Sequence, residues 1–158
     1  MEALNRPRLL AGAIRLAVAC FLLVWAGMSA PPQPGIDFGR YFALVIGNDG
    51  YRHLPRLKTA GNDARAVADL LRARYGFQVE LLLDADRDQL VAAINSYRAT
   101  LRDGDNLLIY YAGHGLIDEP TERGFWLPVD AAPGNEARWL DVALVSSNLR
   151  AMQARHIL

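Results

Sequence analysis

One histidine of the sequence stands where acid–base chemistry is feasible. His114 directly follows the apolar run 107–112, and glycines flank it on both sides. An imidazole with a pKa of about 6.5 exchanges protons at neutral pH, and flanking glycines let the backbone come close to a ligand. A backbone N–H beside such a group can hold a developing oxyanion, so the pair is the equipment of acyl transfer. We therefore take His114 as the candidate catalytic residue.

Other chemistries find less support in the residue types. His53 and His156 lack this setting, and we interpret them as a surface residue and a strand-start residue. The glycine-rich loops do not have the GxGxxG spacing, and the sequence contains no GxxxxGK[ST] loop and no GxSxG elbow. A metal site needs three or four ligands, and His114 with Asp118 and Glu119 forms a weak cluster. The sequence predicts no metal ion and no cofactor.

The composition excludes several function classes. Among 158 residues, 17 are basic and 17 are acidic, so the formal net charge is zero. This balance argues against a nucleic-acid partner. A hydrophobic fraction of 52% with 22% charged residues is typical of a folded domain. The single cysteine, Cys20, excludes an intramolecular disulfide and a cysteine-rich zinc site.

The N-terminal segment predicts targeting rather than folding. Three arginines precede or border the uninterrupted apolar run 16–28. This pattern is typical of a secretory signal, and the run is shorter than the ~20 residues of a membrane-spanning helix. A second interpretation is an uncleaved anchor over residues 9–30, with Arg15 inside the membrane at a cost of a few kcal/mol. Both interpretations stay open.

The predicted domain organisation follows from this segment. Residues 1–30 form the signal peptide or membrane anchor, residues 31–40 a linker, and residues 41–158 the folded domain. We expect the chain to be exported to the periplasm or the outside, or anchored to the inner membrane. Membrane contact is expected only through residues 9–30. Cys20 lies in the targeting segment and is not expected to act as a nucleophile.

The remaining sequence alternates strand and helix patterns. A continuous apolar run predicts a buried strand at 41–46. Further strands are predicted at 77–83 and, from a second apolar run, at 107–112, and a short strand or extended piece at 125–129. Helices of 12–15 residues between parallel strands form βαβ units. The expected fold is therefore α/β, with a mostly parallel sheet and helices on both faces.

Three helices are predicted from their start signals. They begin at Asn62, at Asp86, and at Ser146 or Ser147 with an end near Ala154. Gln89 stands in capping-box spacing from Asp86. Apolar residues of this second helix recur on one face, which we expect to be buried: Leu90, Ile94, Tyr97 and Leu101.

The predicted topology places two unusual loops together. Residues 47–51 follow the first strand, and residues 113–115 follow the third. In open parallel sheets, ligands bind beyond the carboxyl ends of the strands. Both loops leave the same edge of the sheet, so we expect them to meet there.

Five short motifs resemble one known family. They read ALVIGN at 43–48, NDA at 62–64, GFxV at 76–79, YYAGHG at 110–115 and FxLPVD at 125–130. In this order they resemble the large-subunit region of caspase-like cysteine peptidases, peptidase family C14, and most closely the bacterial metacaspase and paracaspase type. The resemblance covers residues 41–158 and implies a caspase-like three-layer fold.

The resemblance implies a cysteine–histidine dyad acting on a peptide or protein substrate. A thiolate attacks the peptide carbonyl, His114 protonates the leaving amine, and the N–H of Gly115 helps to hold the oxyanion. An acidic residue at the position of Asp63 helps to form the pocket for Arg or Lys before the scissile bond. A carboxylate in a first helical turn also stabilises the helix dipole by about 0.3–1 kcal/mol, and both roles are compatible for Asp63.

The sequence departs from the family pattern at the nucleophile. In the family, an Asp-x-Cys-x-Gly sequence follows the stretch that matches residues 155–158, and this sequence holds no such cysteine. We expect a peptidase fragment, incomplete at its C-terminal side, that is inactive by itself. A catalytically inactive binding or regulatory module is the alternative, and a small-molecule-binding α/β domain rests on the fold class alone.

The resemblance suggests calcium as an activating ion, because several relatives are activated by it. The acidic residues Asp84, Asp86 and Asp88 offer oxygen ligands. They lack EF-hand spacing, and a solvated helix start explains them as well.

Overall fold

A computed structural model describes residues 38–158. The predicted export or anchor segment, Cys20 and most of the predicted linker 31–40 lie outside the described residues. Within the linker's last residues, Arg40 forms an ion pair with Asp105 at 2.6 Å. No helix of residues 38–158 is long and apolar enough to cross a membrane.

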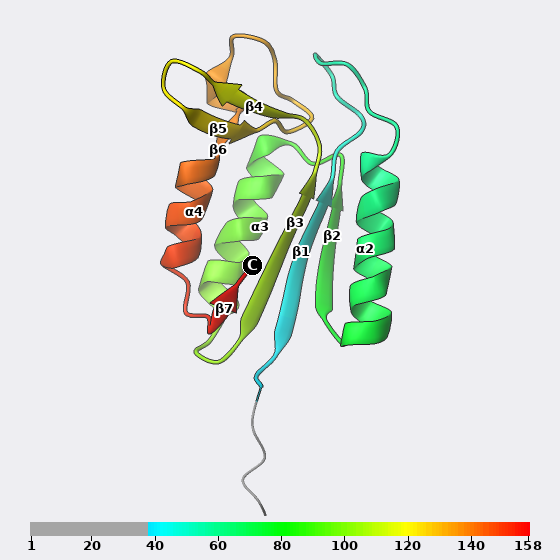
Figure 1. The fold of residues 1–158 in the computed structure, drawn as a ribbon, viewed down its shortest axis with the longest axis vertical. Helices are drawn as coiled ribbons and strands as arrows, with labels where there is room; N and C mark the ends of the chain where they lie inside the picture. The colour runs from blue at the N-terminus through cyan, green and yellow to red at the C-terminus, as the bar shows by residue number, and fades with distance from the viewer. Residues whose placement is uncertain (1–37) are drawn as a thin grey trace, which may run out of the picture. The chain divides into compact units, whose positions relative to one another are not determined.

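The core of the fold is a parallel four-stranded sheet with the order β2-β1-β3-β7. Its strands are β1 (Tyr41–Gly47), β2 (Gln78–Leu83), β3 (Asn106–Ala112) and β7 (His156–Ile157). Figure 1 shows helix α2 (Ala60–Tyr75) on one face of this sheet, with α3 (Arg87–Thr100) and α4 (Val142–Arg150) on the other. The predicted α/β fold with helices on both faces is confirmed.

Alternating residues of β1 bind the sheet to both helix layers. Ala43 and Val45 pack in the cluster that includes α2, whereas Leu44 and Ile46 pack in the cluster that includes α3 and α4. All four side chains are fully buried. Because each strand face is covered, the run is continuously apolar rather than alternating. Burial of one such aliphatic side chain contributes about 1.5–3 kcal/mol.

Helix α3 begins as predicted. The Asp86 carboxylate accepts from the Gln89 backbone N–H, and the Gln89 side chain accepts from the Asp86 N–H, each at 3.0 Å. The predicted inner face is buried in the core: Leu90, Ile94, Tyr97 and the C-cap residue Leu101.

Helix α2 begins before its predicted start. Its first residue is Ala60 and its N-cap is Thr59, which makes no side-chain cap, rather than Asn62. The carboxylate of Asp49 instead binds the first N–H groups of the helix. This cap comes from the preceding loop, so the local residue pattern around Asn62 did not reveal it.

The last predicted helix is present, but its predicted start and end were wrong. Helix α4 is capped by Asp141, whose carboxylate accepts from the Ala143 N–H at 2.7 Å. Ser146 and Ser147 lie inside the helix, and the helix ends at Arg150 instead of near Ala154. The earlier start places Val145 against the core, where it is 3% exposed.

A small antiparallel sheet follows β3. It has the order β4-β5-β6, with β4 (Gly115–Asp118), β5 (Arg123–Trp126) and β6 (Leu140–Asp141). Of these strands, only a short strand or extended piece at 125–129 was predicted, and it corresponds in part to β5. Because β4 begins directly after His114, this sheet extends the carboxyl edge of the main sheet (Figure 1).

Candidate active site

The loops after β1 and β3 meet at the carboxyl edge of the sheet, as predicted. The backbone N–H of Asn48 donates to the carbonyl of Ala112 at 2.9 Å. Beyond this bond, the imidazole of His114 reaches the β1 loop at Pro55. The candidate histidine therefore lies between the two loops that the topology brings together.

The imidazole of His114 is oriented by a main-chain carbonyl. Its Nε2 lies 2.8 Å from the carbonyl oxygen of Pro55. Because a carbonyl only accepts hydrogen bonds, this contact places the proton of the neutral ring on Nε2. The Nδ1 atom then carries the free lone pair and can take up and return a proton. The ring of Tyr51 packs against the imidazole, with 4.5 Å between the centroids.

Two tyrosine hydroxyls fix the backbone of His114. Its N–H donates to the Tyr51 hydroxyl at 2.6 Å. Its carbonyl accepts from the Leu127 N–H at 3.0 Å and from the Tyr111 hydroxyl at 3.0 Å. Burial raises the pKa of Tyr51 and the pKa of Tyr111 above their usual value. Both hydroxyls therefore stay protonated and neutral at physiological pH.

The two glycines around His114 serve different purposes. A Cβ atom on Gly113 would lie 2.6 Å from the Tyr51 hydroxyl and 2.7 Å from the Tyr111 hydroxyl. Gly113 thus makes room for the tyrosines rather than for a ligand, which corrects the expectation for this glycine. A Cβ atom on Gly115 would meet only the Phe125 carbonyl, at 3.6 Å.

The backbone N–H of Gly115 points to the open side of the small sheet. The Leu127 N–H donates to the carbonyl of His114, so His114 and Leu127 are a hydrogen-bonded pair of the ladder. Gly115 and Trp126 form the next pair. Because hydrogen-bonded and non-hydrogen-bonded pairs alternate along an antiparallel ladder, Gly115 and Trp126 form a non-hydrogen-bonded pair. The Gly115 N–H therefore points away from β5. Since β4 is an edge strand, no strand of the described residues covers that side.

Asp63 lies in the first turn of α2. Asp63 is exposed, and its carboxylate makes no hydrogen bond or ion pair with the described residues. The N-terminus of α2 follows the β1 loop, so Asp63 stands at the carboxyl edge of the sheet (Figure 1). His114 and Gly115 are consecutive in the sequence, and no hydrogen bond or ion pair among the described residues connects the Asp63 carboxylate to either of them.

Residues of the β1 loop that the sequence analysis did not assign to the site turn out to support it. They are Asp49, Tyr51 and Pro55. The signal for Tyr51 was its place after two glycines in a loop at the strand end. Pro55 contributes through its backbone carbonyl, which no side-chain pattern reports.

The three aspartates considered for calcium each have a protein partner. Asp84 accepts from the N–H groups of Asp49 and Gly50, at 2.8 and 2.6 Å, and so holds the β1 loop. Asp86 caps α3, and Asp88 lies 3.7 Å from a nitrogen of Arg138. Among residues 38–158, no group of three or more His, Cys, Asp or Glu is arranged to hold a metal ion.

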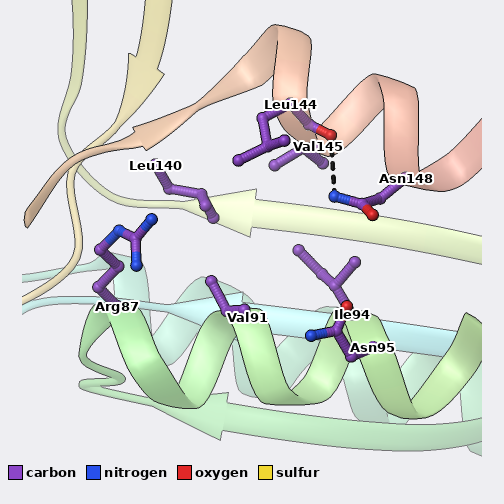
Figure 2. A pocket seen from close by; sticks show the side chains of 8 residues that line it. All are labelled: Arg87, Val91, Ile94, Asn95, Leu140, Leu144, Val145 and Asn148. Atoms are coloured by element: carbon purple, nitrogen blue, oxygen red, sulfur yellow. Dashed lines mark hydrogen bonds between the residues drawn. The ribbon is translucent and has the colours of Figure 1, made fainter. Parts of the chain in front are cut away.

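A separate groove lies between α3 and α4. Figure 2 shows aliphatic side chains from both helices facing one another across it, with Arg87 at one end. Its volume is about 70 Å3. Arg87 donates from Nε to the carbonyl of Trp139, and Asn148 donates to the carbonyl of Leu144. The groove contains none of the candidate site residues and no acid–base pair.

Comparison with known proteins finds matches in sequence and in structure. The family model described as caspase domain, Peptidase C14, matches residues 40–155. Mucosa-associated lymphoid tissue lymphoma translocation protein 1 of Homo sapiens is 36% identical over 113 residues, which cover 72% of this chain and 13% of that protein. Its homolog in Mus musculus is 35% identical over 113 residues, with the same coverage. The chain thus spans a small part of the length of these relatives.

A solved structure shares the fold. The crystal structure of protein GSU0716 from Geobacter sulfurreducens superposes with a TM-score of 0.61 at 22% sequence identity. The match covers 75% of this chain and 48% of that chain. At this identity the likeness shows the fold alone.

Proposed function

This chain belongs to the caspase domain family, Peptidase C14, and on that premise we propose that residues 41–158 form the histidine-bearing part of a cysteine endopeptidase domain. The observation that carries the proposal is the orientation of His114. Its Nε2 is occupied by the Pro55 carbonyl, so Nδ1 is the free acid–base atom at the carboxyl edge of the sheet.

The proposed reaction uses a thiolate from outside residues 38–158, because the sequence contains only Cys20. The thiolate attacks the carbonyl carbon of the scissile peptide bond, and the outward N–H of Gly115 holds the resulting oxyanion. Nδ1 of His114 takes the proton of the thiol as the thiolate forms, and the carbon–nitrogen bond breaks as Nδ1 gives that proton to the leaving amine. Water activated by the neutral imidazole then hydrolyses the thioester and regenerates the thiol.

Asp63 supports a preference for Arg or Lys before the scissile bond. Its exposed carboxylate has no partner among the described residues and so can receive a cationic side chain without breaking an existing ion pair. The full chain can be titrated with N-acetyl-arginine amide and followed by NMR. Asp63→Asn should weaken binding several-fold, whereas Asp69→Asn, at an exposed aspartate farther along α2, should leave it unchanged. Equal binding by wild type and Asp63→Asn would refute the assignment.

The catalytic part of the proposal needs a nucleophile to be supplied. We would express the reading frame continued past Leu158 and assay it with peptides that carry Arg, Lys or Asp before the cut. Cleavage after Arg and Lys, lost by at least a hundredfold in His114→Ala, is the expected result. Full activity in His114→Ala would overturn the role of this residue.

A non-catalytic caspase-like module is the second candidate. The observation in its favour is that residues 38–158 contain no cysteine. A continued frame without an Asp-x-Cys sequence, together with intact binding of N-acetyl-arginine amide, would support it over the peptidase.

For localisation we propose export or anchoring to the inner membrane, supported by the apolar run 16–28 after its arginines. Residues 1–40 fused to a reporter enzyme that is active only outside the cytoplasm should give activity. Loss of that activity on replacing Leu22 and Leu23 by Arg is the expected control, and an inactive wild-type fusion would contradict the proposal.

A further inference from the structure

Tyr51 contacts both the backbone and the ring of His114. Its hydroxyl accepts the His114 N–H at 2.6 Å, and its ring lies 4.5 Å from the imidazole at an interplanar angle of 54°. Tyr51 is itself 5% exposed and packs in a cluster with Phe125 and Leu127. A rigid side chain therefore holds His114 at two points.

Tyr51 belongs to the same loop as the acceptor of the imidazole. Pro55, whose carbonyl faces Nε2 of His114, stands four residues along the chain. The N–H of Arg52, the residue after Tyr51, donates to the Val129 carbonyl at 2.9 Å, which holds the loop against the segment after β5. One anchored loop therefore supplies both the Tyr51 side chain and the Pro55 carbonyl that contact His114.

The hydroxyl of Tyr51 has a purpose beyond packing. A phenylalanine would fill the same apolar cluster without burying a polar group, and a buried hydroxyl costs free energy unless it is hydrogen-bonded. Its partner is the His114 N–H, and the space for it exists because residue 113 is glycine.

We propose that Tyr51 is a positioning residue for His114, which holds the imidazole with Nε2–H on the Pro55 carbonyl and Nδ1 free. The inference rests on the proposed function, because the free Nδ1 is the atom that this function uses. Tyr51 touches no reacting atom. Its effect is exerted through the backbone and ring of His114.

The test is the tautomer of His114 in the full chain, measured from its imidazole nitrogen shifts by NMR at a pH about two units above the ordinary pKa of about 6.5. In wild type the Nε2–H tautomer should predominate. Tyr51→Phe should move the two nitrogen shifts toward each other, and Tyr51→Leu, which also removes the ring, should move them further. Unchanged shifts in both variants would overturn the proposal.

Tyr97→Phe is the matched control. Tyr97 is 7% exposed and its hydroxyl donates to the Ala43 carbonyl at 3.3 Å, so this variant also removes one buried hydroxyl, away from His114. It should leave the His114 shifts at their wild-type values. An equal shift in Tyr97→Phe would show a general structural effect and would overturn the specific role of Tyr51.

Two further measurements keep the proposal testable if the variants do not fold. In wild type, the His114 amide proton should exchange slowly with solvent and show a nuclear Overhauser contact to the Tyr51 ring. Fast exchange without that contact would overturn the proposal. None of these NMR measurements needs a thiol or a substrate. If they support the role of Tyr51 while the protein expressed from the continued reading frame shows no peptidase activity, only the peptidase function is refuted.

Discussion

The carboxylate of Asp49 accepts a hydrogen bond from the backbone N–H of Gly61 at 2.9 Å. Its other oxygen accepts from the N–H of Ala60 at 3.0 Å. One residue of the loop after β1 thereby caps the N-terminus of α2. Asp49, at the start of the loop that carries Tyr51 and Pro55, thus binds the end of the same loop, where α2 begins. The Leu57 N–H, which donates to the Asp49 carbonyl, closes it further.

Removal of this cap should destabilise the fold. Asp49→Ala leaves two N–H groups of α2 without acceptors, and loss of an N-cap costs about 0.5–2 kcal/mol. Urea unfolding followed by circular dichroism would measure the loss. Asp69→Ala, which removes a carboxylate whose side chain is 77% exposed on the same helix, should change the unfolding free energy by less than about 0.5 kcal/mol. Equal losses in the two variants would contradict the capping role.

The caps of the three helices explain which helix starts could be predicted. The start of α3 depends on Asp86 and Gln89, three residues apart, and this local pattern was interpreted correctly. The cap of α2 spans eleven to twelve residues of loop, and the sequence around Asn62 offered a plausible local substitute. For α4, Asp141, Ser146 and Ser147 are comparable N-cap residues by type. The helix starts after Asp141 because this start buries Val145 in the core, which the local sequence does not reveal.

Asp141 joins two stabilising contacts that substitutions can separate. It caps α4 and forms an ion pair with Arg123, whose side chain is 49% exposed. Asp141→Asn keeps a capping oxygen but loses the charge, so it should cost less than about 1 kcal/mol. Asp141→Ala loses both contacts and should cost about 1 kcal/mol more. Urea midpoints in the order wild type, Asn, Ala are expected, and an Asn variant as unstable as Ala would contradict this division.

Acid should weaken the fold partly through Asp105. The hydrogen bond from Arg40 holds the pKa of this buried carboxyl below its usual range. A lowered folded-state pKa means that the stabilisation is present above the unfolded pKa of about 3.9 and is lost as pH falls through the folded value. Asp105→Asn should therefore be less stable than wild type at pH 6.

The pH dependence of that difference is the measurement. Urea unfolding at intervals from pH 6 to pH 2.5 should show the gap between wild type and Asp105→Asn staying level down to about pH 5 and then narrowing. Asp69→Asn, at an exposed carboxylate, should show a small gap throughout. A gap for Asp105→Asn that widens on acidification would show that the sign of the pKa shift is wrong.

The candidate site was predictable where chemistry and topology coincide in one residue. His114 follows β3, an interior strand of the sheet, at the edge where ligands bind, so its type and place both pointed to it. The contacts that orient it come from the Pro55 carbonyl and the Tyr51 hydroxyl, about sixty residues earlier. Only the parallel pairing of β1 with β3 brings them together, and neither shows a spacing to His114 that a sequence pattern can reveal.

The glycines on either side of His114 should respond oppositely to the same substitution. In Gly113→Ala, the new Cβ would lie 2.6 and 2.7 Å from the hydroxyls of Tyr51 and Tyr111, so buried aromatic rings must move. Overpacking of this kind costs about 1–3 kcal/mol. In Gly115→Ala, the nearest atom is the Phe125 carbonyl oxygen at 3.6 Å, an ordinary contact, and the backbone N–H is retained.

Gly115→Ala should therefore match wild type in urea midpoint or exceed it slightly, because alanine restricts the unfolded chain by about 0.4–1 kcal/mol more than glycine does. Gly113→Ala should also broaden or shift the His114 imidazole signals in NMR spectra, since both tyrosines hold its backbone. Equal stability of the two alanine variants would mean that the tyrosine hydroxyls do not occupy the space beside residue 113. The expected asymmetry separates a glycine whose missing Cβ makes room for two tyrosine hydroxyls from one beside which there is space for a methyl group.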